Sequence, residues 1–166
     1  AARGAGELAA MEQCRLMSHR PHAEPRSAYR HFMPIQTRWA DNDAYGHVNN
    51  VQYYSYFDTA VNQFLIERGV LDIHKGDVVG FVVDSGCSYF SPIAFPDKVH
   101  VGIRVVKLGN SSVRYQVGID RNDDATPAAV GHFVHVYVER SSNCAVPIPT
   151  NVRNVLESIL STASTG

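Results

Sequence analysis

The chain has 166 residues, of which 45% are hydrophobic and 19% charged, and its formal net charge is -1 at pH 7. This length suits one domain with a sizeable core. The near-neutral charge argues against a nucleic acid or an anionic membrane as partner, because no basic excess exists to drive counterion release. No apolar run approaches the ~20 residues of a membrane-spanning helix. The three cysteines show no C-x-x-C pair and no zinc spacing, so we expect reduced thiols in a cytoplasmic protein.

The N-terminal residues 1–27 are rich in Ala, Gly, Arg, Pro and His and carry no sustained strand pattern. We expect a disordered tail here. A targeting peptide is the alternative: Arg3 and Arg15 favour it, whereas Glu7 and Glu12 are unusual for such peptides. The folded domain is therefore expected over residues 28–166.

The first strand is expected over Arg30–Trp39, where apolar residues alternate loosely. The stretch Asp41–Gly69 follows, and the rest of the chain is built around it. Its first half is a polar turn, and its second half predicts a long helix with apolar residues at three- and four-residue steps. Those residues are Val51, Tyr54, Phe57, Val61, Phe64 and Leu65. Asn49 is a good N-cap, with Gln52 placed to return a bond in a variant of the capping box, and Gly69 ends the helix.

Four strands follow the helix in hairpin-like succession. They are expected over Asp77–Tyr89, Lys98–Leu108, Val113–Ile119 and Val130–Val138, and a short helix over Asn151–Leu160 closes the chain. On the last strand, Val130, His132, Val134, Val136 and Val138 share one face, so His132 and His135 point to opposite faces. The order predicts an α+β fold in which a five-stranded antiparallel sheet wraps around one long helix. Because one helix cannot cover both faces of such a sheet, we also expect subunits to pair.

The polar turn before the helix is the first candidate site. Asp41, Asp43 and His47 lie just upstream of a helix start, which presents unpaired N–H groups and roughly half a positive charge. An anion developing on a substrate oxygen would be stabilised there. Asp41 is close enough in sequence to raise the pKa of Asp43 as a like charge. Two carboxylates and one imidazole are too few and too generic to predict a metal site.

A second candidate site lies in the hairpin turn after Lys98–Leu108. Cations, hydroxyl groups and exposed amides gather there, in Lys107, Asn110, Ser111, Ser112 and Arg114. Such a group can hold a phosphate or the amides of a pantetheine arm. It can equally be a solvated hairpin tip.

The segment DAYGHVNNVQY, from Asp43 to Tyr53, resembles the active-site segment of hotdog-fold acyl-CoA thioesterases of the 4-hydroxybenzoyl-CoA thioesterase-like group. The resemblance implies that Asp43 is the catalytic carboxylate, acting as a base toward water or as a nucleophile. It implies that the backbone N–H of Asn50 polarises the thioester carbonyl. Family members place coenzyme A, a part of the substrate and not a separate cofactor, across strand edges near a subunit interface. A homodimer or homotetramer is therefore expected, and the hairpin turn gains support as a binding site.

Several alternatives stay open. His47 and the H-V-N-N-x-x-Y continuation also resemble the acyl-ACP thioesterase branch, although that branch has Asn where this chain has Tyr45. A hotdog hydratase would carry Asn-Pro between its aspartate and histidine, and this chain does not. A non-catalytic acyl-binding protein is the third alternative. For His47, a bond to the backbone and a contact with substrate are both open, and Tyr53 either packs in the helix or faces the pocket.

Overall fold

The computed structural model describes residues 22–161. Its regular elements follow the predicted order of strand, long helix, four strands and short helix. They are η1 (Arg26–Ala28), β1 (His31–Gln36), η2 (Trp39–Asp41), α2 (Asn50–Glu67), β2 (Val78–Tyr89), β3 (Lys98–Leu108), β4 (Ser112–Arg121), β5 (Ala129–Glu139) and α3 (Thr150–Ser158).

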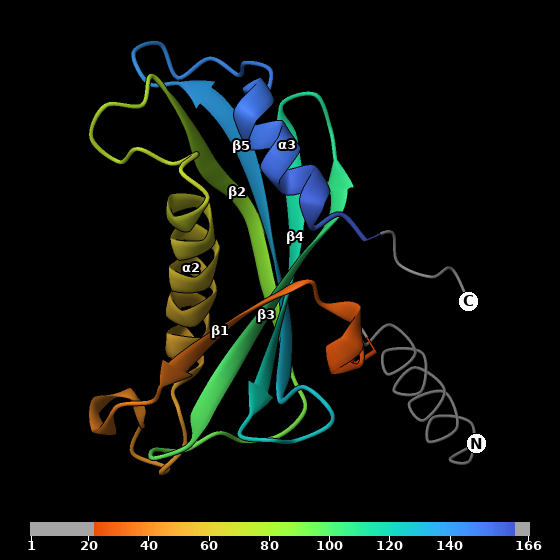
Figure 1. Ribbon diagram of the computed structural model, residues 1–166. Coiled ribbons are helices and arrows are strands. Elements are labelled where there is room, and N and C mark those ends of the chain that lie inside the picture. Colours follow the sequence, from red (N-terminus) through yellow and green to blue (C-terminus); the bar gives the residue numbers. More distant parts are fainter. Residues whose placement is uncertain (1–21, 162–166) are drawn as a thin grey trace, which may run out of the picture.

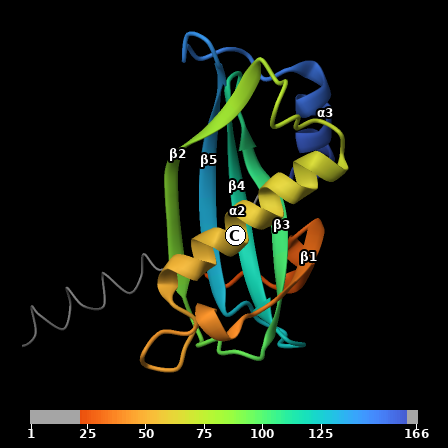
Figure 2. The same ribbon diagram turned by 90° about the vertical axis from the view of Figure 1, so that its left-hand side faces the viewer.

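The five strands form one antiparallel sheet in the order β1-β3-β4-β5-β2. The sheet curves, and α2 lies along its concave face (Figures 1 and 2). This arrangement confirms the predicted α+β fold. β1 pairs with the first part of β3, and the chain after α3 takes over farther along, where Leu160 bridges to Val105. β2 forms the other edge of the sheet and, among residues 22–161, pairs with β5 alone.

The core lies between α2 and the sheet. In β3, Val99, Val101, Ile103 and Val105 are fully buried, as their alternation predicts, and the facing residues of β4 are buried with them. β5 is apolar on both of its faces. Phe133, whose ring meets Phe57 of α2 edge-on at 5.9 Å, belongs to the face toward the helix. The residues from Val130 to Val138 that we expected to share a face do so on the opposite, outer side.

The buried face of α2 is rotated from the predicted one. Tyr53, Tyr56 and Ala60 are buried together with Phe57 and the apolar residues of the later turns, whereas Val51 is 64% exposed. The prediction for Val51 was therefore wrong. Helical spacing does not distinguish Val51 from the other apolar residues of the predicted face. The orientation of the first turn of α2 is set by the polar turn before it and by Tyr56.

The segment before β1 covers part of the outer face of the sheet. Tyr29 lies so close to Gly102 and Gly118 that a Cβ on either glycine would meet its side chain at 2.8 and 2.5 Å. Glu24 forms an ion pair with the buried Arg104 at 3.3 Å. Contacts with the domain therefore begin before residue 28, inside the predicted tail, whose first 21 residues lie outside the described part of the chain. Within residues 22–161, no helix combines the length and apolarity needed to cross a membrane.

Candidate active site

Asp43 opens a tight turn before α2. Its N–H donates to the His47 carbonyl at 2.8 Å, and its carbonyl accepts from the Gly46 N–H at 3.1 Å. Gly46 has φ 81°, a left-handed conformation that favours glycine. The Asp43 side chain is half-buried, and its Oδ1 accepts a bond from the Tyr45 N–H at 2.8 Å. This bond fixes the carboxylate, and among the described residues none donates to its Oδ2.

Asp41, two residues earlier, is in a different environment. It is buried, and its carboxylate accepts bonds from the Arg38 N–H, the Arg38 guanidinium and the Tyr56 hydroxyl, the last at 2.7 Å. Burial alone would raise the pKa of Asp41, but the bonds from Tyr56 and Arg38 outweigh it and leave that pKa below its ordinary value. Asp41 thus anchors η2 to α2. The expectation that it would tune Asp43 was based on sequence proximity, whereas the bonds of Asp41 go to Arg38 and Tyr56.

The start of α2 leaves one backbone donor free. The Asn49 side chain accepts from the Val51 N–H at 3.1 Å, which confirms the predicted N-cap. The Gln52 N–H donates to the Asn49 carbonyl, so the first turn is closed by backbone. Within the described chain, the Asn50 N–H has no acceptor. The helix start is itself held in place, because Asn49 N–H donates to the Asp41 carbonyl and Val48 N–H to the Ile93 carbonyl.

Aromatic side chains surround this end of α2. Tyr53 is buried and meets Tyr89 of β2 edge-on at 4.9 Å, and burial raises its pKa to about 12. Tyr53 therefore packs as a neutral side chain at this end of α2. Tyr45 and Trp39 are exposed, and the ring centroids of Trp39 and Phe95 lie 5.9 Å apart. Sequence reasoning missed the contacts of Tyr89 and Tyr56, because each one joins residues far apart in the chain.

His47 and Asn50 complete the predicted catalytic group. Both side chains are exposed, and among the described residues neither takes part in a side-chain hydrogen bond. The structure thus brings together Asp43, His47 and the Asn50 N–H within one short turn and the first residue of the helix.

The hairpin turn between β3 and β4 lies at the other end of the sheet (Figure 1). The turn before α2 lies near the start of β3, because the Asn42 side chain accepts a hydrogen bond from the Phe95 N–H. The hairpin turn follows the last residue of β3. The eleven residues of β3 separate the two regions, and the ten steps from its first residue to its last cover about 33 Å at ~3.3 Å per step. One subunit therefore does not bring the two predicted groups into a single site.

The backbone of the hairpin turn is bonded to the C-terminal part of the domain. Arg153 of α3 donates to the Gly109 carbonyl at 2.6 Å and to the Asn110 carbonyl at 3.2 Å. Asn110 also accepts from Ile148 N–H, and Ser111 from Tyr137 N–H. The turn is thus no freely solvated hairpin tip.

The cations beside that turn lie on the outer face of the sheet. Lys107 and Arg114 are cross-strand partners; Lys107 is exposed, and the side chain of Arg114 is 41% exposed. Arg114 contacts Asp84 at 3.4 Å, and the same carboxylate bonds His132 at 3.0 Å. Adjacent like charges repel, and one carboxylate only partly offsets them. In residues 22–161, no cluster of three or more His, Cys, Asp or Glu side chains has the arrangement of a metal site.

The chain is similar to one family model and to several proteins of known structure. A family model described as the thioesterase-like superfamily matches residues 37–156. The PA5185 protein of Pseudomonas aeruginosa strain PAO1 is 54% identical, with a TM-score of 0.82 over 84% of this chain and 98% of that one. Slr0204, a 1,4-dihydroxy-2-naphthoyl-CoA thioesterase from Synechocystis, shares 19% identity and a TM-score of 0.70, over 75% of this chain and 93% of its own.

A third structure, the gentisyl-coenzyme A thioesterase BH1999, is 23% identical, with a TM-score of 0.68 over 76% of this chain and 99% of its own. At these lower identities, the likeness to the two named thioesterases shows a shared hotdog fold. The family match supports a hydrolase that acts on thioesters. Its 120 residues span most of the chain and include the whole turn before α2, and the chain therefore belongs to the thioesterase-like superfamily.

Proposed function

We propose that the protein hydrolyses acyl-CoA thioesters, with Asp43 as the catalytic carboxylate. The observation that carries the proposal is the pairing of two unsatisfied groups in one turn: a fixed, half-buried carboxylate and the free Asn50 N–H at a helix start. Thioester hydrolysis needs both a group that activates water or attacks the carbonyl and a donor for the oxyanion.

The chemistry follows from the two oxygens of Asp43. Oδ1 is held by Tyr45 N–H, so Oδ2 is the oxygen that acts. As a base, it accepts a proton from the water that attacks the carbonyl carbon. As a nucleophile, it attacks the carbonyl carbon itself and forms an acyl-aspartate anhydride, which water then hydrolyses to the carboxylic acid and the free Asp43 carboxylate. The thioester oxygen becomes negative in the transition state, and the Asn50 N–H and the helix dipole stabilise it there. The carbon–sulfur bond then breaks, and the thiolate leaves and takes up a proton. The products are a carboxylic acid and free coenzyme A. We propose that His47, which is exposed beside the turn, contacts the substrate.

We propose Lys107 and Arg114 as the groups that bind the phosphates of coenzyme A. They form an adjacent pair of cations, of which Lys107 is exposed and Arg114 partly exposed, and a phosphate would satisfy this pair better than Asp84 alone. The side chains of Asn110, Ser111 and Ser112 lie in the same turn and add polar contacts.

Within one subunit, these cations lie too far from Asp43 to share a site with it. We therefore propose a homo-oligomer in which one subunit supplies Asp43 and another subunit supplies the cations. We propose β2 as the interface between the subunits. It is an edge strand of 12 residues, and Phe81, Val82 and Val83 at its middle are 46%, 48% and 60% exposed. Such an edge favours pairing with a second copy. Light scattering that gives a stable monomer at micromolar concentration would exclude this assembly.

A screen of acyl-CoAs with a free-thiol reagent tests the proposed function. We expect enzyme-dependent thiol release from at least one acyl-CoA, faster than from the matching acyl-ACP. Preference for the acyl-ACP would favour the acyl-ACP thioesterase instead. Binding of acyl-CoA without any release of thiol would favour the non-catalytic acyl-binding protein.

A further inference from the structure

One polar contact in the core connects α2 with the segment that leads into the candidate active site. The Tyr56 side chain is 4% exposed, and its hydroxyl donates to Oδ2 of Asp41 at 2.7 Å. Burial, and then the bond to Asp41, raise the pKa of Tyr56, so its hydroxyl keeps its proton at neutral pH. Asp41 accepts this proton as a carboxylate, and a hydrogen bond to a charged group is roughly twice as strong as a neutral one. The bond therefore fixes Asp41 against α2.

Both groups proposed for catalysis are tied to Asp41 by short stretches of backbone. On one side, the Asp41 carbonyl accepts the Asn49 N–H at 2.8 Å, and Asn49 is the cap that immediately precedes the free Asn50 N–H. On the other side, Asp43 follows two residues later and opens the tight turn. The bond from Tyr56 therefore bears on the separation between the Asp43 carboxylate and the oxyanion donor.

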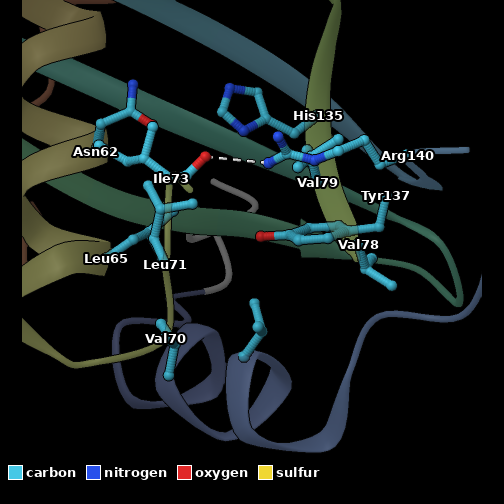
Figure 3. A pocket seen from close by; sticks show the side chains of 12 residues that line it. Asn62, Leu65, Val70, Leu71, Ile73, Val78, Val79, His135, Tyr137 and Arg140 are labelled. Atoms are coloured by element: carbon cyan, nitrogen blue, oxygen red, sulfur yellow. Dashed lines mark hydrogen bonds between the residues drawn. The ribbon is translucent and has the colours of Figure 1, made fainter. Parts of the chain in front are cut away.

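Contacts farther along α2 do not fix the helix start in the same way. The side-chain hydrogen bonds of Asn62 and Gln63 stay within the helix. At its far end, α2 borders a cavity of about 400 Å³, which Leu65 lines together with residues of the loop that follows (Figure 3). Packing at that end therefore leaves space beside the helix. The helix start depends on the contacts close to it, and Tyr56 supplies the one to a buried carboxylate.

We infer that the Tyr56 hydroxyl, acting through Asp41, positions the oxyanion donor at the start of α2 relative to the Asp43 carboxylate. Tyr56 is a positioning residue in this role, because it acts through Asp41 and not on the substrate. The inference rests on the proposed function, since it concerns the same reaction. A displacement of about 1 Å can lower a rate by ~10²-fold. A loosened turn should therefore lower kcat and leave the surfaces that bind substrate unchanged.

Tyr56→Phe tests the inference, because it removes the hydroxyl and keeps the ring. We expect kcat for the best acyl-CoA to fall on the order of tenfold while KM stays nearly constant, the pattern of an interaction needed in the transition state alone. Tyr29→Phe is the matched control. Tyr29 is also 4% exposed, it packs on the outer face of the sheet, and its hydroxyl has no partner among the described residues. An unchanged kcat in Tyr56→Phe would overturn the inference.

Combination with Asp43→Asn distinguishes positioning from a general structural effect. Once the carboxylate is gone, its separation from the oxyanion donor no longer matters. Adding Tyr56→Phe should then lower the residual kcat by less than about twofold, because residues that act as a unit have non-additive effects. A further tenfold fall in the double variant would mean that Tyr56 acts independently of Asp43, which contradicts the inference.

Backbone dynamics give a readout that does not need turnover. The NMR order parameter of the Asn50 N–H should be that of rigid backbone, about 0.85, in the wild type and in Tyr29→Phe, and should fall below about 0.7 in Tyr56→Phe. Equal order parameters in the three proteins would also overturn the inference. If the wild type hydrolyses no acyl-CoA, the proposed function fails, and this measurement still decides whether Tyr56 holds the helix start.

Asp41→Asn is the second variant, for the case that Tyr56→Phe does not fold. Its amide oxygen can still accept the bond from Tyr56, but only as a neutral group, so the bond is weaker. We expect the same two changes at smaller size: a fall in kcat of about threefold at constant KM, and a lower order parameter for the Asn50 N–H. Wild-type values of both quantities would contradict the role of Tyr56.

Discussion

The two predicted site regions, the turn before α2 and the hairpin turn after β3, differ in which groups they leave free. In the first, a backbone N–H and a carboxylate oxygen are unsatisfied, at Asn50 and Asp43. In the second, the backbone is bonded by Arg153 and Ile148, while the side chains of Lys107 and Arg114 remain accessible. An oxyanion requires a fixed backbone donor, whereas a phosphate requires charged side chains. This difference is the reason why we propose chemistry for the first region and binding for the second.

The largest expected effect on stability concerns the anchor of the first region. Asp41→Ala removes the acceptor of the bonds from Arg38 and leaves the buried Tyr56 hydroxyl without its partner. We expect the free energy of unfolding to fall by about 3 kcal/mol. Urea denaturation measures this, with Asp123→Ala, an exposed carboxylate in a turn, as control. A change as small as that of the control would mean that Asp41 does not anchor the turn.

Arg153→Ala should have the next largest effect, because it removes the charged donor to the Gly109 and Asn110 carbonyls. We expect a loss of about 1.5 kcal/mol in the free energy of unfolding and no change in kcat. Arg30→Ala is the control for loss of an exposed arginine. A large fall in kcat with unchanged stability would break the comparison, since it would give the hairpin turn a catalytic role.

Arg114→Gln examines the binding role of the second region. If Arg114 holds a phosphate of coenzyme A, KM for acyl-CoA should rise on the order of tenfold while kcat stays nearly constant, which is the pattern of lost uniform binding. Steady-state kinetics with Arg30→Gln as control measures both constants. An unchanged KM would leave the pair formed by Arg114 and Asp84 with a structural role only.

The smallest effect is a change in acid stability. The pKa of Asp41 is lower in the folded protein than its ordinary value of 3.8. Its contribution to stability is therefore complete above that value and is lost as the pH falls through the folded pKa. Between about pH 4.5 and 2.5, the free energy of unfolding should fall less steeply in Asp41→Asn than in the wild type. Equal slopes would contradict the lowered pKa.

The sequence predicted the fold because strand alternation and the helix cap are local signals. The bounds of Lys98–Leu108 agree with β3, and Asn49 caps α2. Alternation could not decide which face of β5 meets the helix, since Phe133 and Tyr137 on one face and the valines on the other are all apolar. The exposure of Val51 was missed for a similar reason: periodicity identifies a face and not the point where its burial begins.

The candidate site was only partly predictable. Asp41 and Asp43 are the same residue type two positions apart, and the bonds from Arg38 and from Tyr56, fifteen residues away, distinguish the buried anchor from the half-buried carboxylate of Asp43. The separation of the two turns follows from the direction and length of β3, which the residue types in those turns do not indicate.

The central claim is that Asp43 carries out thioester hydrolysis, and the turnover number of Asp43→Asn tests it most directly. Asparagine keeps the shape of the side chain and can still accept the bond from Tyr45 N–H through its amide oxygen, so the turn should persist. It removes the base and the negative charge. We expect kcat for the best acyl-CoA to fall by on the order of 10²-fold or more while KM changes little. A kcat within about threefold of the wild-type value would exclude Asp43 from the mechanism and make His47 the candidate base.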